Sequence, residues 1–138
     1  MQFLNSTYKT NKPLIVGLVF IFSSVFVVTF FYLYSIIPHL DKGLHVIGGF
    51  IVVWFFSQFW FEKLKTFSHK ECLLIFMSLA ALVGFFWEVA EFSTAFPPLV
   101  DWGPLKNYLY IGSLVDTLGD FTANILGAAL FSLFRLDR

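Results

Sequence analysis

The chain has 138 residues, of which 58% are hydrophobic and 13% are charged, and its formal net charge at pH 7 is zero. Soluble domains average roughly 25% charged residues, so this composition and a mean hydropathy of +0.79 indicate an integral membrane protein. The absence of net charge excludes the basic field that would attract nucleic acid, and the single cysteine, Cys72, excludes an intramolecular disulfide.

Four apolar segments are long enough to form transmembrane helices, each of which needs about 20 residues. The first follows Pro13 and ends before Pro38, over about residues 14–37, and contains no charged residue. It is longer than the roughly 7–15 apolar residues of a signal peptide, so we expect it to be retained. The other predicted helices span about residues 44–61, 72–92 and 114–134. Lipid satisfies no backbone polar groups, so the expected fold is an all-α bundle forming one domain over residues 1–138.

The distribution of Lys and Arg predicts the orientation of the bundle. Seven of the nine basic residues fall before the first helix, between the second and third, or after the fourth: Lys9, Lys12, Lys63, Lys65, Lys70, Arg135 and Arg138. Only Lys42 and Lys106 fall in the other connections. Cytoplasmic loops of membrane proteins carry the excess of positive charge, so we expect both termini to be cytoplasmic.

Polar residues gather at the predicted outer ends of three helices. Residues three or four apart share one helix face, and each of these sets has that spacing. Exposing an Asp to lipid costs at least about 2.5 kcal/mol, so we expect the three polar faces to meet in one pocket. The predicted pocket residues are Asp41, His45, Glu88, Glu91, Asp116, Asp120 and Asn124.

Five of these residues are carboxylates, and two negative charges about 4 Å apart repel by roughly 4 kcal/mol at an effective dielectric constant of about 20. Either some of them hold protons, or a cation lies among them, or Lys42 and His45 neutralise part of the charge. Oxygen ligands with one imidazole suit Mg²⁺ or Mn²⁺, and Zn²⁺ is also compatible. We favour a divalent cation.

Simpler roles remain open for several of these residues. Asp41 and Asp116 also fit helix N-caps, Glu91 fits an exposed residue at the membrane interface, and His45 fits an ordinary packing residue. Gly48, Gly49 and Gly127 are interpreted as small residues that allow close helix packing. The connection over residues 93–113 is long and contains Trp and Tyr, which suits either a lid over the pocket or an interfacial anchor.

Four short strings resemble the signature of VanZ-like and YjdF-like bacterial membrane proteins: DKGLH at 41–45, WEVAE at 87–91, DTLGD at 116–120 and NILGA at 124–128. The resemblance covers about residues 38–134. It implies a small multi-pass protein of the bacterial inner membrane and the cell envelope, without a settled activity. VanZ itself is associated with low-level teicoplanin resistance. VanZ-like members commonly carry Gln near the position of Glu91, which favours the YjdF-like branch.

Three functions are compatible with these features. The pocket could hold a divalent cation and, through it, the head group of an anionic lipid or cell-envelope precursor. It could belong to a metal-dependent enzyme acting on a lipid-linked phosphate, with Glu88 or Glu91 as general base. It could form part of a proton or ion pathway. The inner halves of the helices lack ionisable residues, and no obvious nucleophile or phosphate-binding Arg is present, so we favour binding and assign no catalytic residue.

Overall fold

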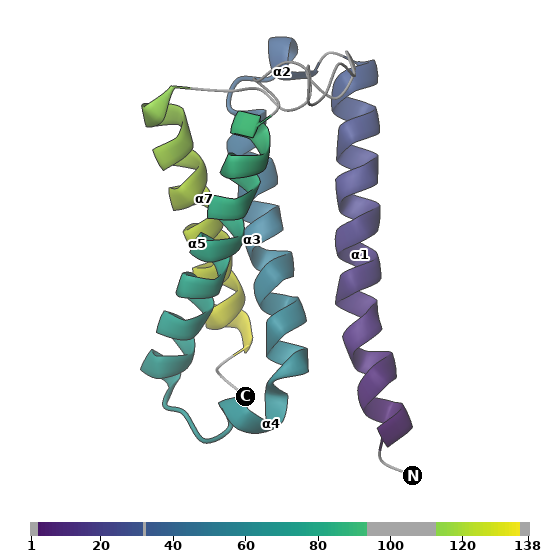
Figure 1. The fold of residues 1–138 in the computed structure, drawn as a ribbon, viewed down its shortest axis with the longest axis vertical. Helices are drawn as coiled ribbons and strands as arrows, with labels where there is room; N and C mark the ends of the chain where they lie inside the picture. The colour runs from purple at the N-terminus through teal and green to yellow at the C-terminus, as the bar shows by residue number, and fades with distance from the viewer. Residues whose placement is uncertain (1–2, 32, 94–112, 136–138) are drawn as a thin grey trace.

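The structure is a computed structural model that describes residues 3–31, 33–93 and 113–135. Within these ranges the chain is helical, with turns between the helices and no strand. The helices are α1 (Phe3–Phe30), α2 (Leu33–Ile36), α3 (Leu40–Phe59), α4 (Phe61–Leu64), α5 (His69–Ser93) and α7 (Leu114–Arg135), as drawn in Figure 1. The connection predicted as a lid or anchor lies almost entirely within residues 94–112, outside the described residues.

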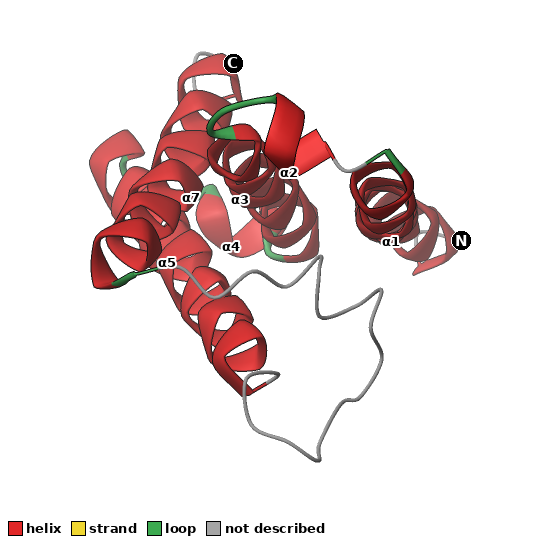
Figure 2. Cartoon of the chain, turned by 90° about the horizontal axis from the view of Figure 1, so that it is seen from above, coloured by secondary structure: helices red, strands yellow, loops and turns green. Residues whose placement is uncertain are grey.

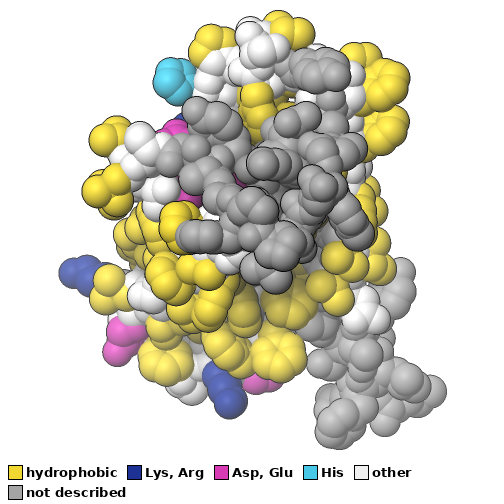
Figure 3. Space-filling model, turned by 45° about the horizontal axis from the view of Figure 1, so that its top comes forward, with side chains coloured by type: hydrophobic (Ala, Val, Ile, Leu, Met, Phe, Trp, Pro, Cys, Tyr) yellow, Lys and Arg dark blue, Asp and Glu magenta, His cyan; other side chains and the backbone are white. Residues whose placement is uncertain are grey.

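Four of these helices are long and apolar enough to cross a membrane, over Asn11–Val28, Leu40–Phe59, His69–Ser93 and Leu114–Phe134. This confirms the predicted all-α multi-pass fold. The start of α1 and the end of α7 lie at the same end of the bundle in Figure 1, as termini on one side of the membrane require. Hydrophobic side chains cover most of the described surface in Figure 3, and charged side chains are few.

The first predicted helix differs from the observed one at both ends. The helix α1 begins at Phe3 rather than after Pro13, and Pro13 lies buried inside it. It then ends at Phe30, and the separate turn α2 precedes Pro38. A helix of 28 residues is already about 42 Å long, which exceeds the hydrocarbon thickness of about 30 Å. Its candidate membrane span, Asn11–Val28, has 18 residues and is about 27 Å long, so it nearly crosses the hydrocarbon without residues 31–37.

Three helices form a close cluster and the fourth stands apart. The helix α7 packs against α3 and α5, whereas α1 packs mainly against α3, and Figures 1 and 2 show α1 separated from the others. A Cβ added at Gly49 would overlap the backbone of Asn124, and one added at Gly127 would overlap the backbone of Val46. These two glycines therefore lie where the backbones of α3 and α7 approach most closely, which favours van der Waals packing in lipid.

The half of the cluster nearer the chain termini, here called the apolar end, has a core of buried apolar side chains. The core residues are Val53, Cys72, Phe76, Ala80, Ala128 and Phe131. The Phe131 ring meets Phe50 and Phe76 edge to face, with centroid distances of 5.1 Å and 6.1 Å. The polar residues lie in the opposite half of the same three helices, here called the polar end.

Candidate functional site

A lysine joins three aspartates at the polar end of the bundle. The Nζ of Lys42 lies 3.0 Å from Asp41 Oδ2, 2.5 Å from Asp116 Oδ1 and 2.8 Å from Asp120 Oδ1. It also donates to the backbone carbonyl of Asp116, at 3.1 Å. The side chain of Asp120 is only 5% exposed, so this ion pair is the most deeply buried of the three. Lys42 thereby ties the start of α3 to the start of α7.

The contacts of Asp41 and Asp116 differ from those of helix caps. The backbone N–H of Asp116 donates to Ser113 Oγ at 3.3 Å, so Ser113 caps α7 and leaves the Asp116 carboxylate to Lys42. At the start of α3 the N-cap residue is His39, which has a left-handed φ of 59° and makes no side-chain capping bond. Both aspartates therefore use their carboxylates in ion pairs with the lysine.

His45 connects the lysine and its aspartates to Asn124, one turn deeper. Its Nε2 lies 3.4 Å from Asp120 Oδ1, and its Nδ1 lies 3.0 Å from the Asn124 side-chain nitrogen. Asn124 is buried and fills the space beside Gly84 on α5, where an added Cβ would lie 2.7 Å from Nδ2. An amide can donate to an unprotonated Nδ1 or, when turned over, accept from Nδ1–H. Asn124 can therefore serve either neutral tautomer of His45.

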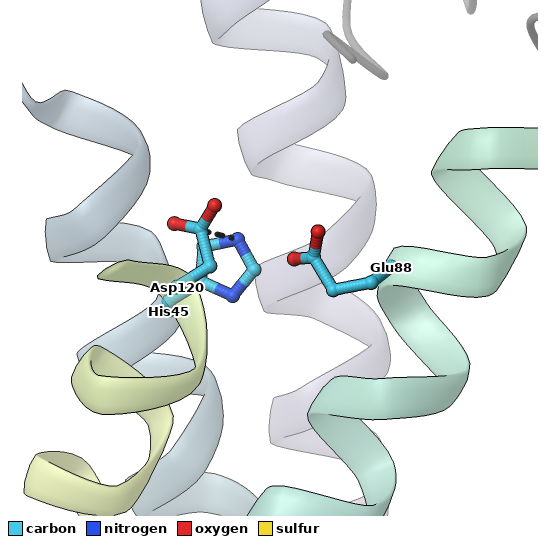
Figure 4. A group of neighbouring side chains, drawn as sticks. All are labelled: His45, Glu88 and Asp120. Atoms are coloured by element: carbon cyan, nitrogen blue, oxygen red, sulfur yellow. Dashed lines mark ion pairs between the residues drawn. The ribbon is translucent and has the colours of Figure 1, made fainter. Parts of the chain in front are cut away.

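Glu88 completes a second group of charged side chains, drawn in Figure 4. One ligand atom each from His45, Glu88 and Asp120 lie within 4.8 Å of one another, although the residues come from three different helices. The Oε1 atom of Glu88 is buried and has no hydrogen-bond partner among the described residues. Buried polar atoms are nearly always hydrogen-bonded, so this oxygen needs an explanation.

Glu91, the last predicted pocket residue, lies nearby but has a different partner. Its Oε1 accepts a hydrogen bond from Trp87 Nε1 at 2.6 Å, within α5. Glu91 belongs to neither group of clustered ligand atoms, although it lines the same cavity as Asp120 and Asn124. We use the name polar cluster for Asp41, Lys42, His45, Glu88, Asp116, Asp120 and Asn124.

Two positions in the polar cluster could hold a cation, and they share Asp120. The first is surrounded by Asp41, Asp116 and Asp120, and the ammonium group of Lys42 already occupies it. The second is surrounded by His45, Glu88 and Asp120. Two ligands bound tetrahedrally at about 2.1 Å lie about 3.4 Å apart, and His45 Nε2 and Asp120 Oδ1 are 3.4 Å apart. The donor set therefore suits a divalent cation, and this spacing matches one pair of bound ligands.

A cavity of about 760 Å³ opens beside the polar cluster. One end is lined by polar side chains that include Asp41, His45, Asp120 and Asn124, and apolar residues of α1 and α3 line the rest. Gly48 lies on its wall, and an added Cβ there would make only an ordinary contact, 3.9 Å from Asn124 Oδ1. Gly48 is therefore a cavity residue, in contrast to Gly49 and Gly127 at the close helix contact.

The sequence interpretation included Lys42 only as one possible source of neutralisation, and it missed three supporting residues. Lys42 follows Asp41 directly, so helical spacing turns it about 100° away and does not place it on the same face. Gly119 makes room for it, since an added Cβ would lie 2.9 Å from Lys42 Cε. Gly84, which lies beside Asn124, carries no distinguishing signal in the sequence, whereas Trp87, which donates to Glu91, belongs to the WEVAE string at 87–91 but had no role assigned to it.

The fold and the site define a multi-pass α-helical membrane protein with charged side chains gathered at one end of its bundle. Over residues 5–136 the chain matches the family described as "Predicted membrane protein (DUF2238)", and it belongs to that family. Neither the curated proteins nor the solved structures contain a significant match. The finer resemblance to VanZ-like and YjdF-like proteins stays a prediction.

Proposed function

We propose that the polar cluster binds a divalent cation between His45, Glu88 and Asp120 and, through it, an anionic lipid or cell-envelope precursor head group. The buried, unpartnered Oε1 of Glu88 is the observation that carries this proposal. Leaving a buried acceptor unpaired costs about 1–3 kcal/mol, and more when the group is charged. A cation at this position would remove that cost.

The charge balance of this end of the bundle supports the same proposal. Among the described residues, five carboxylates, those of the three aspartates with Glu88 and Glu91, gather at this end with one ammonium group, that of Lys42. If all of them are ionised, four negative charges remain uncompensated near the membrane interior, where charge is expensive. A divalent cation would cancel two of them without requiring any proton to be taken up.

The donor set suggests which ions suit the site. One imidazole and two carboxylates are ligands for Mn²⁺ or Zn²⁺, and Mg²⁺ commonly binds one or two carboxylates and keeps several waters. Three protein ligands leave coordination positions open for an oxygen of a second molecule. A phosphate or carboxylate head group is the anion that such a position would accept in a membrane.

Binding is better supported than a proton or ion pathway. A pathway would need polar steps through the apolar end, and the buried side chains there include Ser57 and Ser132. Each donates to a carbonyl of its own helix, Ser57 to Trp54 at 2.8 Å and Ser132 to Ala128 at 2.8 Å. Such bonds satisfy the hydroxyl locally and give no continuous relay.

The described residues also favour binding over catalysis. A metal-dependent hydrolase would use the same cation with a general base and, commonly, an arginine to hold the phosphate. Among the described residues that line the cavity, none is an arginine or a cysteine. Glu91 is the carboxylate outside the ligand groups that could act as a base, and it already accepts a bond from Trp87.

The test is a measurement of bound metal in the detergent-purified protein. We expect the parent protein to bind one divalent ion, and the Glu88→Gln variant to lose it, because an amide is a weaker, uncharged ligand. The matched control is Glu62→Gln, which removes an exposed carboxylate that pairs with Lys65 at the other end of the bundle. A parent protein that binds no Mg²⁺, Mn²⁺ or Zn²⁺, or a Glu88→Gln variant that keeps the ion, would overturn the proposal.

A further inference from the structure

The cavity beside the polar cluster is long as well as large. Its lining includes Asp41 near the start of α3 and Phe56 near the end of that helix, and on α1 it reaches Pro13. Fifteen residues of helix separate Asp41 from Phe56, which corresponds to about 22 Å. The cavity therefore extends through most of the roughly 30 Å hydrocarbon thickness of a bilayer.

The chemistry of the lining changes along this length. At one end lie charged and polar groups, and beyond Gly48 the wall is formed by side chains such as Leu18, Ile21, Ile51 and Val52. No ion pair or hydrogen-bond donor of the polar cluster reaches this apolar part among the described contacts. A molecule that matched both parts would have an elongated hydrocarbon portion and a compact polar group at one end.

The loose packing of α1 explains why this space exists. The helix contacts mainly α3, and it stands apart from α5 and α7 in Figures 1 and 2. Where α1 comes close, an added Cβ on Gly17 would lie only 3.2 Å from Ile51 Cγ2. The apolar part of the cavity therefore lies between α1 and the cluster formed by α3, α5 and α7.

We infer that the cavity holds one hydrocarbon chain of a lipid phosphate, with the phosphate at the Asp41, His45 and Asp120 end. The volume of about 760 Å³ lies within the range of about 300–1,000 Å³ found for sites that enclose a single small molecule. It suits one chain with its head group better than a phospholipid with two chains. The occupant is thus a single-chain lipid phosphate.

This inference rests on the proposed function, because the charge of the site opposes a bare phosphate. In the described part of the chain the surrounding carboxylates outnumber Lys42, so an anionic head group would be repelled unless a cation lay between them. The lipid should therefore bind only together with the divalent ion. Removal of the ion by a chelator should release the lipid.

The probe is radiolabelled farnesyl monophosphate, measured by equilibrium binding to the full chain in neutral detergent. The decisive variants are Leu18→Trp, which fills the cavity, and its neighbour Val19→Trp, which adds the same ring outside it. Val19 is 58% exposed and is not among the cavity residues. We expect Leu18→Trp to weaken binding at least tenfold, a typical effect of steric mismatch in a hydrophobic pocket, and Val19→Trp to leave it within about twofold. Both variants should keep the bound metal.

A second pair on α3 keeps the test decisive if the Leu18→Trp protein does not fold. Val52→Phe narrows the cavity, and Ile47→Phe enlarges a side chain that is 46% exposed and does not line it.

A parent protein that binds the cation but not farnesyl monophosphate overturns this inference alone. Equal effects within each pair, or equal competition by two-chain phosphatidylglycerol, also overturn it. Lipid binding without any bound cation overturns the proposed function and, with it, the cation-bridged phosphate.

Discussion

At the polar end of the bundle α3, α5 and α7 meet through charged and amide side chains, whereas at the apolar end the same helices meet through aromatic rings and small residues. The contacts of Lys42 with three aspartates depend on charge and direction. The contacts of Phe131 with Phe50 and Phe76 depend on shape and volume. One helix cluster therefore tolerates different kinds of substitution in its two halves.

The proposed ion site lies at the polar end because, in the part of the chain that the structure describes, only that end groups side chains that could bind a cation. At the apolar end, packing between apolar side chains stabilises the helices without adding any affinity for ions. Charged groups in a membrane are costly, and they persist where a ligand or partner compensates them. The clearest example is Glu88. Its Oε1 atom is buried and has no hydrogen-bond partner among the described residues, so a bound ligand is the proposed source of compensation.

The largest effect is expected from Asp120→Leu, which tests whether the polar end is held by charge. The substitution keeps the branched shape of the side chain but removes the acceptor shared by Lys42 and His45, and it leaves a largely buried ammonium group with fewer partners. Removing one partner of a buried ion pair typically costs about 3–5 kcal/mol, and we expect a loss near the lower limit because Lys42 keeps two aspartates. Thermal unfolding in detergent would measure it.

The double variant Lys42→Met with Asp120→Leu provides the control for that prediction. When both members of a buried pair become apolar, no uncompensated charge remains, so part of the lost stability should return. Two results would contradict a charge-dependent contact at this end. One is an Asp120→Leu protein as stable as the parent. The other is a double variant whose loss of stability equals the sum of the losses of the two single variants.

The next effect is expected at the apolar end from Phe131→Ala. Phe131 is 4% exposed and contacts two other rings, so truncation leaves a cavity among them. In soluble proteins such a change costs about 3–5 kcal/mol, but lipid solvates an exposed ring better than water does, so we expect about 2 kcal/mol. The melting temperature should fall while the bound metal stays unchanged. Loss of the metal in this variant would show that the two ends are not independent.

Helix positions were predictable because the length of an apolar segment is a local property of the sequence. The spacing of Asp116, Asp120 and Asn124 likewise places them on one face without knowledge of the fold. The rotation of α3 against α7 was not predictable in this way, because it depends on the backbone contacts at Gly49 and Gly127. That rotation brings Lys42 onto the aspartates of α7, a contact between residues far apart in sequence.

The end of α1 at Phe30 was missed for a different reason. Residues 14–37 contain no charged residue and are hydrophobic on average, so hydropathy contains little signal for a break at residue 30. The part of α1 that is apolar enough to cross the membrane still begins near Asn11, close to the predicted start, although the helix itself begins at Phe3. Hydropathy alone therefore does not set the end of α1, and a segment-by-segment interpretation cannot capture it.

The smallest effect on stability is expected from Lys65→Ala. This substitution tests whether an ion pair stabilises the protein when it is exposed to solvent. Lys65 lies 3.1 Å from Glu62, a distance similar to that between Lys42 and Asp41. The Lys65 pair is exposed, with side chains 55% and 81% accessible, so water and salt screen it. We expect unfolding free energy within about 0.5 kcal/mol of the parent. A loss as large as that of Asp120→Leu would mean that burial does not distinguish the two lysines, and the contrast between a solvent-screened pair and a partly buried one would fail.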